Sequence, residues 1–153
     1  MNEFDNVTEM FEAEIAKYIG RKHVIAVNNG TAAIHTALLA TSLWNSVIVT
    51  TPFTFTATVD PILDVGSYPV FCDIDPKTYC LDPKEVVKTV EGEFNGLYDA
   101  LLTVDLFGNM GNLEETREVC DEYGLFMIED ASQAFGASLN GKKAGTFGDI
   151  ATV

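Results

Sequence analysis

The spacing of hydrophobic and polar residues changes several times along the chain, which predicts alternating helices and strands. Apolar residues recur at helical spacing over residues 10–19, and Gly20 follows where a left-handed residue commonly ends a helix. Residues 23–27 form a short apolar run that predicts a buried strand. The next segment, TAAIHTALLA, is rich in alanine and leucine and favours a helix beginning near Gly30 or Thr31.

Four further apolar or β-branched runs have the length of strands, namely SVIVT, YPVFCD, ALLTV and LFMIE. Between them, Asp82 and Pro83 provide a helix cap and a proline suited to the first helical position. Asn112 repeats the capping pattern. We expect the two helices that follow these caps to end near Val90 and at Gly124.

Strands that are separated by helical crossovers generally lie parallel in one sheet. The pattern therefore predicts a single α/β domain with a mainly parallel sheet and helices on both faces. Ligands of such sheets bind beyond the carboxyl ends of the strands. This directs attention to the segments NNGTA, PFTFTAT, DLFGN and EDASQ, which follow predicted strands.

Composition narrows the classes of function. Hydrophobic residues make up 47% of the 153 residues and charged residues 21%, as in an ordered globular protein. A net charge of −14 disfavours binding to nucleic acid or to an anionic membrane. No apolar run is long enough to span a bilayer and the first residues are polar, so we expect a soluble cytoplasmic protein.

The three cysteines predict neither a disulfide framework nor a metal site. Cys72, Cys80 and Cys120 are odd in number and form no C-x-x-C pair. We expect them to be reduced packing residues.

The segment VNNGTAAIHTALL carries a strand through a turn of small residues directly into a helix. Free backbone N–H groups and the positive end of the helix dipole meet at such a point, which suits a phosphate. A tight connection capped by Thr31 explains the same residues equally well. The turn lacks the glycine and lysine spacing of a nucleotide P-loop or a dinucleotide fold.

In LFMIEDASQAFGA, an apolar strand ends in Glu129 and Asp130. A carboxylate at the end of the strand can accept a charge-assisted hydrogen bond from a protonated ring nitrogen and so keep that ring electron-withdrawing. The alternative is that Asp130 caps the next helix and Glu129 is solvated. The residues alone favour neither interpretation.

Other residues with possible chemistry have simpler explanations. Phe53 and Phe55 lie in a loop where a ring can cover a planar cofactor, although loop aromatics usually only pack. His35 lies in an apolar helix and is best explained as a packing residue. Lys142 and Lys143 follow an Asn-Gly turn, so we expect an exposed hairpin rather than a lysine that reacts with a cofactor.

Several segments in order resemble the nucleotide-sugar aminotransferases of the DegT/DnrJ/StrS type, which belong to the fold-type-I pyridoxal-phosphate enzymes. The resemblance covers nearly the whole chain and is carried by these segments: FEAEIAKYIG, VNNGTAAIHTALLA, FTFTAT, VGSYPVFCDIDPKTYCLDP, VDLFGN, IEDASQAFGA and GKKAGTFGDI. It implies pyridoxal 5′-phosphate as the cofactor. It also implies that Gly30, Thr31 and Ala32 hold the cofactor phosphate, chiefly through backbone N–H groups.

The same resemblance assigns roles to three side chains. Phe55 matches the aromatic residue that stacks on the pyridine ring, and Asp130 matches the carboxylate on the ring nitrogen. Gln133 matches the residue near the phenolic oxygen. The independent interpretation of the glycine turn and of Asp130 agrees with these roles.

The chain departs from the family pattern at two places. The segment TSLWNSVIV is shorter than the glycine-rich acidic turn that the family usually has there, and FGDIATV stands just before the family's S-F-x-P-x-K segment with its catalytic lysine. We therefore expect residues 1–153 to form a partial fold-type-I large domain, without the C-terminal small domain and without a catalytic residue. Such a chain would be inactive alone.

For the intact enzyme, the resemblance implies transfer of an amino group from an amino-acid donor, expected to be glutamate, to a nucleotide-linked keto sugar. The pathway would be polysaccharide or sugar-derivative biosynthesis, and the enzyme a homodimer with active sites at its interface. A related dehydratase branch has histidine in place of the lysine and is left open. A non-catalytic homologue or pseudoenzyme that pairs with an intact subunit is a further alternative.

Overall fold

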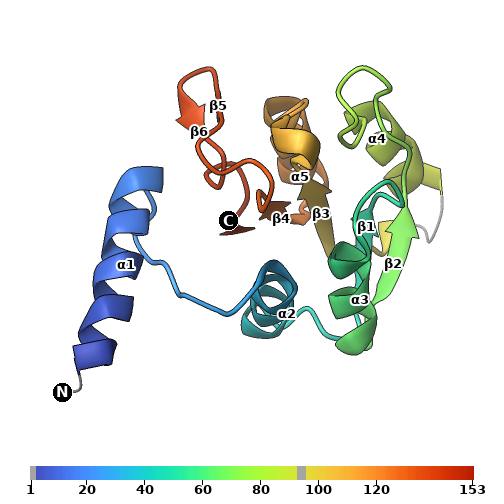
Figure 1. Cartoon of the computed structure of the whole chain (residues 1–153). Coiled ribbons are helices and arrows are strands. Elements are labelled where there is room, and N and C mark those ends of the chain that lie inside the picture. The colour runs from blue at the N-terminus through green and yellow to red at the C-terminus, as the bar shows by residue number, and fades with distance from the viewer. Residues whose placement is uncertain (1–2, 93–95) are drawn as a thin grey trace.

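The computed structural model describes residues 3–92 and 96–153. Its centre is a sheet of five parallel strands in the order β2-β1-β3-β4-β7 (Figure 1). The strands are β1 (Val47–Thr50), β2 (Tyr68–Phe71), β3 (Ala100–Val104), β4 (Phe126–Asp130) and β7 (Ile150–Thr152). The predicted α/β fold with a mainly parallel sheet is confirmed.

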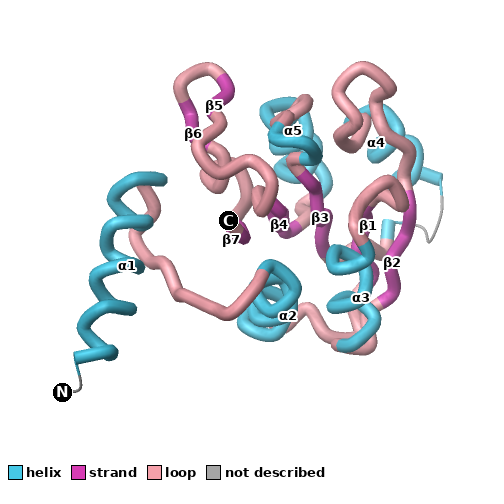
Figure 2. Tube along the Cα trace, viewed as in Figure 1, coloured by secondary structure: helices cyan, strands magenta, loops and turns pink. Residues whose placement is uncertain are grey.

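Helices cover both faces of the sheet, as Figure 2 shows. The helices are α1 (Glu3–Ile19), α2 (Gly30–Ala40), α3 (Thr56–Asp64), α4 (Pro83–Gly92) and α5 (Leu113–Tyr123), with a short 3-10 turn, η2 (Leu106–Gly108). Successive strand residues point to opposite faces. Met127 therefore packs with the α4 and α5 side, whereas Ile128 packs with the α2 and α3 side.

The predicted helix ends and the hairpin are confirmed, but the Asn112 side chain makes no capping hydrogen bond at the start of α5 in the described part of the chain. The Lys84 N–H donates to the Asp82 carboxylate at the start of α4, with a nitrogen–oxygen distance of 2.9 Å. Gly124 ends α5 at a φ of 68°, where a residue without Cβ is favoured. Asn140 and Gly141 connect the two short antiparallel strands β5 (Ser138–Leu139) and β6 (Lys142–Lys143).

The prediction of a buried strand at residues 23–27 is wrong. These residues form a loop in which Ile25 is 75% exposed. The Ala26 N–H donates to the Glu12 side chain at 2.8 Å, so the loop is held against α1 instead of joining the sheet. The helix α3 was not predicted, because its β-branched residues and Pro61 are poor helix formers.

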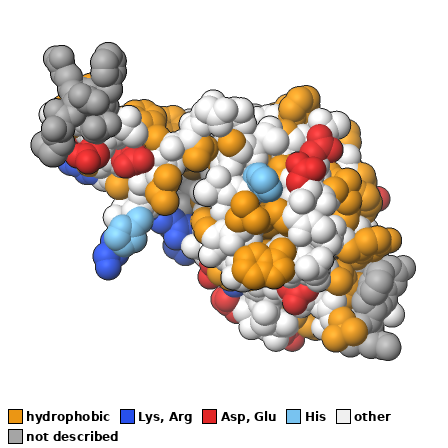
Figure 3. All heavy atoms as spheres, turned by 90° about the horizontal axis from the view of Figure 1, so that it is seen from below, with side chains coloured by type: hydrophobic (Ala, Val, Ile, Leu, Met, Phe, Trp, Pro, Cys, Tyr) orange, Lys and Arg blue, Asp and Glu red, His pale blue; other side chains and the backbone are white. Residues whose placement is uncertain are grey.

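An apolar hollow of about 760 Å³ separates α1 from the body of the domain. Phe11 and Ile15 of α1 line one side, and Ala33 and Ala37 of α2 line the other, beside β7. Figure 1 shows α1 standing to the side of the sheet, joined to α2 by an extended loop. Seen from below in Figure 3, hydrophobic side chains are spread over much of the molecule's surface.

The three cysteines are buried and form no disulfide within the described residues, as expected of packing residues. Within residues 3–92 and 96–153, no helix has the length and apolar character needed to cross a membrane. The same ranges contain no cluster of histidine, cysteine and acidic residues able to hold a metal ion.

Candidate functional site

Asp130 is the last residue of β4 and is only 6% exposed. Its Oδ1 accepts hydrogen bonds from the hydroxyls of Ser132 at 2.6 Å and Thr152 at 3.0 Å. Its Oδ2 is 3.4 Å from the Thr58 hydroxyl, a long contact. The hydroxyls fix the carboxylate, and Oδ2 retains capacity for a stronger donor.

The N-terminus of α2 lies beside Ser132, a partner of this carboxylate. A Cβ on Gly30 would be 3.1 Å from the Ser132 hydroxyl, which itself bonds Asp130, so the turn and the strand end are in contact. The Asn29 side chain accepts from the Ala32 N–H at 2.8 Å. In the described part of the chain, the N–H groups of Gly30 and Thr31 have no protein acceptor. These two groups and the helix dipole are therefore free to bind an anion.

The ring of Phe55 is exposed near the Asp130 carboxylate and is available to cover a ligand. Phe55 precedes α3, is 70% exposed and has no aromatic partner among the described residues. Thr58, one turn later, contacts Asp130, which places the start of α3 beside the carboxylate. Phe53, by contrast, stacks on Tyr79 with ring centroids 6.0 Å apart. Of the two phenylalanines, Phe55 has the ring that is free to cover a ligand.

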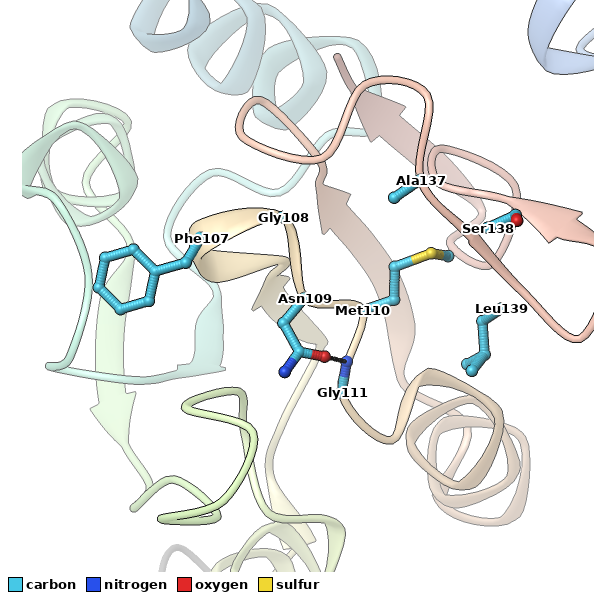
Figure 4. Close-up of a pocket in the computed structure, with 8 residues that line it drawn as sticks. All are labelled: Phe107, Gly108, Asn109, Met110, Gly111, Ala137, Ser138 and Leu139. Carbon is cyan, nitrogen blue, oxygen red and sulfur yellow. Dashed lines mark hydrogen bonds between the residues drawn. The ribbon is translucent and has the colours of Figure 1, made fainter.

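Gln133 joins the loop after β4 to the turn after β3. Its side-chain oxygen accepts from the Phe107 N–H at 2.8 Å. Phe107 has a φ of 59°, an unusual backbone conformation that this bond helps to hold. A pocket of about 330 Å³ lies beyond this turn, where Met110 points toward Ser138 and the Phe107 ring points away (Figure 4).

Glu129 is fully buried, so the alternative that it is solvated is wrong. Its carboxylate accepts from the backbone N–H groups of Gly145 at 2.5 Å, Phe147 at 2.7 Å and Gly148 at 2.9 Å. On the outside of this loop, Arg21 donates to the carbonyls of Gly145 at 2.7 Å and Gly148 at 2.5 Å. Glu129 therefore holds a loop together, a role that the local sequence did not indicate.

Asp105 is a third buried carboxyl, and the sequence did not single it out, although its segment DLFGN was expected near the ligand. Its N–H donates to the Asp130 carbonyl at 3.0 Å, but neither of its side-chain oxygens has a partner in the described part of the chain. Burial, followed by the negative charges of Glu129 and Asp130, raises the pKa of the Asp105 carboxyl well above its ordinary value.

Comparison with protein-family models gives a match over residues 3–153 to the DegT/DnrJ/EryC1/StrS aminotransferase family. The chain belongs to this family. A GDP-perosamine synthase of Vibrio cholerae is 38% identical to it over 146 residues, which cover 94% of this chain and 38% of the relative.

Solved structures of aminotransferases have the same fold. DesI, determined in the presence of its TDP-sugar product, matches with a TM-score of 0.87 and 32% identity over 95% of this chain and 36% of DesI. NtdA of Bacillus subtilis, with bound cofactor PMP, matches with a TM-score of 0.81 and 32% identity over 90% of this chain and 31% of NtdA. The chain thus spans well under half the length of each of these relatives.

Within this DegT/DnrJ/EryC1/StrS fold, the hairpin lysines contact other parts of the molecule. The ammonium of Lys143 donates to the Tyr18 carbonyl and lies 3.6 Å from the centre of the Tyr18 ring. Lys142 is exposed, with its ammonium 5.5 Å from the centre of the Phe147 ring. His35 is half-buried on α2. None of these three side chains is bonded to Asp130 or to the turn at Gly30 in the described part of the chain.

Proposed function

We propose that this chain is the pyridoxal 5′-phosphate-binding part of an aminotransferase that acts on a nucleotide-linked keto sugar. The observation that carries the proposal is that Ser132 bonds the buried carboxylate of Asp130 and lies beside the Gly30 turn, where the N–H groups at the start of α2 are free. Membership of an aminotransferase family supports it. NtdA, a structural relative, contains PMP, the amino form of the same cofactor.

The residues fit such a cofactor. The N–H groups of Gly30 and Thr31 would hold the phosphate, while Ala32 can join them only if its N–H leaves the Asn29 side chain. Gly30 suits this cradle because a Cβ would press on the Ser132 hydroxyl at 3.1 Å. The absence of a side chain keeps the backbone accessible.

The remaining assigned residues would orient the ring. Phe55 would cover one face of it, and Gln133 would lie near the phenolic oxygen. The Asp130 carboxylate would keep the ring nitrogen protonated through a charge-assisted hydrogen bond, with Ser132 and Thr152 fixing its orientation. When bound, the cofactor supplies an electron sink for charge that develops on the substrate.

For the whole protein, we propose transfer of an amino group from an amino acid, expected to be glutamate, to the sugar ketone. Two of the relatives, the GDP-perosamine synthase and DesI with its TDP-sugar product, are named for nucleotide-linked sugars, which supports this substrate class. Residues 1–153 would form part of the large domain of a cytoplasmic homodimer and would supply no catalytic residue themselves. The pathway would be polysaccharide or sugar-derivative biosynthesis.

Titration of the purified chain with pyridoxal phosphate, followed by the cofactor's absorbance and fluorescence, tests the proposal. We expect weak saturable binding that Asp130→Asn weakens about tenfold, the loss of roughly one charge-assisted hydrogen bond. Asp60→Asn, at an exposed site on α3, is the matched control and should leave the affinity unchanged. Equal affinities for all three proteins would refute the assignment of Asp130.

A non-catalytic role beside an intact subunit is the second candidate, favoured by the engagement of Lys143 with Tyr18. Borohydride reduction of the chain with pyridoxal phosphate, followed by peptide mapping, shows whether one lysine reacts specifically with the cofactor or whether several react without specificity. We expect scattered substoichiometric labelling without amino-donor turnover. Stoichiometric labelling of one lysine, such as Lys142, together with turnover would show that the chain is active alone.

A further inference from the structure

Three carboxyl groups are buried where β3 and β4 end. Asp105 and Glu129 are 0% exposed and Asp130 is 6% exposed. No lysine, arginine or histidine side chain of residues 3–92 and 96–153 pairs with any of them. Three negative charges without a counter-ion are very costly in a buried cluster, so at least one carboxyl group must hold a proton.

The hydrogen-bond donors identify which group holds the proton. Glu129 accepts from three backbone N–H groups, which stabilise its anion. Asp130 accepts from the hydroxyls of Ser132 and Thr152. Asp105 accepts from no donor in the described part of the chain. The anion of Asp105 is therefore the least stabilised of the three.

Within residues 3–92 and 96–153, the other elements around Asp105 contribute no cation. Besides Glu129 and Asp130 on β4, the titratable group that interacts with it is the Cys80 thiol of the loop before α4. Burial raises the pKa of Cys80 to about 11, so this thiol is neutral at physiological pH. Neither neighbouring element offers a positive charge that would favour ionised Asp105.

We propose that Asp105 is a neutral carboxylic acid at physiological pH and acts as a positioning residue for Asp130. Its proton limits the cluster to two negative charges, which allows Asp130 to remain the carboxylate that faces the ligand. An ionised Asp105 would draw a proton onto Asp130 and weaken it as an acceptor for a protonated ring nitrogen. The relation to the ligand rests on the proposed function, whereas the protonation of Asp105 does not.

The sign of the effect on stability follows from the raised pKa of Asp105. The folded protein binds this proton more tightly than the unfolded chain, so the contribution of Asp105 to the free energy of unfolding is fully favourable at low pH. It is lost as the pH rises through the folded-state pKa, which makes the protein less stable over about pH 5 to 8. Asp105→Asn is neutral at every pH and should remove this loss.

Carbon-13 NMR of the aspartate carboxyl groups in the cofactor-free chain tests the proposal directly. With resonances assigned through the backbone of the unmutated protein, we expect Asp105 to titrate well above the ordinary aspartate range. A titration of Asp105 near pH 4 would overturn the proposal. The measurement needs no variant to fold and no cofactor to bind.

Urea unfolding across the same pH range provides a second test. The fall in stability between about pH 5 and 8 should occur in the unmutated protein and in the exposed control Asp60→Asn, and should be absent in Asp105→Asn. The same fall in all three proteins would contradict the proposal. Because both experiments use the cofactor-free chain, failure to bind pyridoxal phosphate would refute the proposed function without affecting this result.

Discussion

Replacement of Glu129 by glutamine tests whether the buried carboxylate holds the loop at residues 145–148. Its Oε1 accepts from Gly145, and its Oε2 accepts from Phe147 and Gly148. A glutamine has one oxygen and one NH₂ group. If its oxygen faces Phe147 and Gly148, its NH₂ group must face the Gly145 N–H, so two donors meet in a buried position.

The magnitude follows from these contacts. At least one hydrogen bond to a charged group is lost, which costs about 1.5–3 kcal/mol. An unsatisfied buried donor adds about 1 kcal/mol or more, so we expect the free energy of unfolding to fall by about 2–4 kcal/mol. In a domain of this size, that corresponds to a fall of about 5–15 °C in melting temperature.

The assay is urea unfolding followed by circular dichroism, with thermal melting as a second measurement. The matched control is Glu118→Gln, which makes the same chemical change at an exposed residue of α5 without a partner in the described part of the chain. We expect the control to change stability by less than about 0.5 kcal/mol. If Glu129→Gln were as mild as the control, the inferred role of this carboxylate would be wrong.

Two further substitutions test the same loop from other sides. Gly148→Ala places a Cβ 2.6 Å from the Ile150 carbonyl, so unfolding experiments should show a loss of stability above about 3 kcal/mol. The control Gly92→Ala enters open space and should be neutral or stabilising. Equal effects of the two substitutions would contradict this packing. Arg21→Lys loses the paired hydrogen bonds to the carbonyls of Gly145 and Gly148, so it should lower the free energy of unfolding by about 1–3 kcal/mol and speed hydrogen exchange at the Gly145 amide. Unchanged exchange would show that Arg21 does not hold this loop.

The parts of the fold that follow local rules were predictable from the sequence. The helix over TAAIHTALLA, the apolar strand segments and the hairpin at Asn140 and Gly141 each depend on residues that are close together in the chain. The run at residues 23–27 has the composition of a strand, but the Ala26 N–H bonds to Glu12 instead of to the sheet. Local composition cannot show which partner a backbone group finds.

The candidate site was predictable only in part, for the same reason. The end of an apolar strand indicated that Asp130 would face the ligand edge, and its contact with the Gly30 turn through Ser132 agrees with this. The roles of Glu129 and Asp105 depend on which donors reach them. The donors to Glu129 are supplied 16 to 19 residues away, and Asp105 has none in the described part of the chain. These long-range pairings can be identified only from the tertiary structure.

The two adjacent carboxylates at the end of β4 have different roles because successive strand residues point to opposite faces. Met127 packs on the side of α4 and α5, and Glu129, two residues later, reaches the 145–148 loop. Ile128 packs on the side of α2, and Asp130, two residues later, meets the residues around the start of that helix. The pleat of a single strand therefore separates the carboxyl group that holds the 145–148 loop from the carboxyl group that lies near the start of α2.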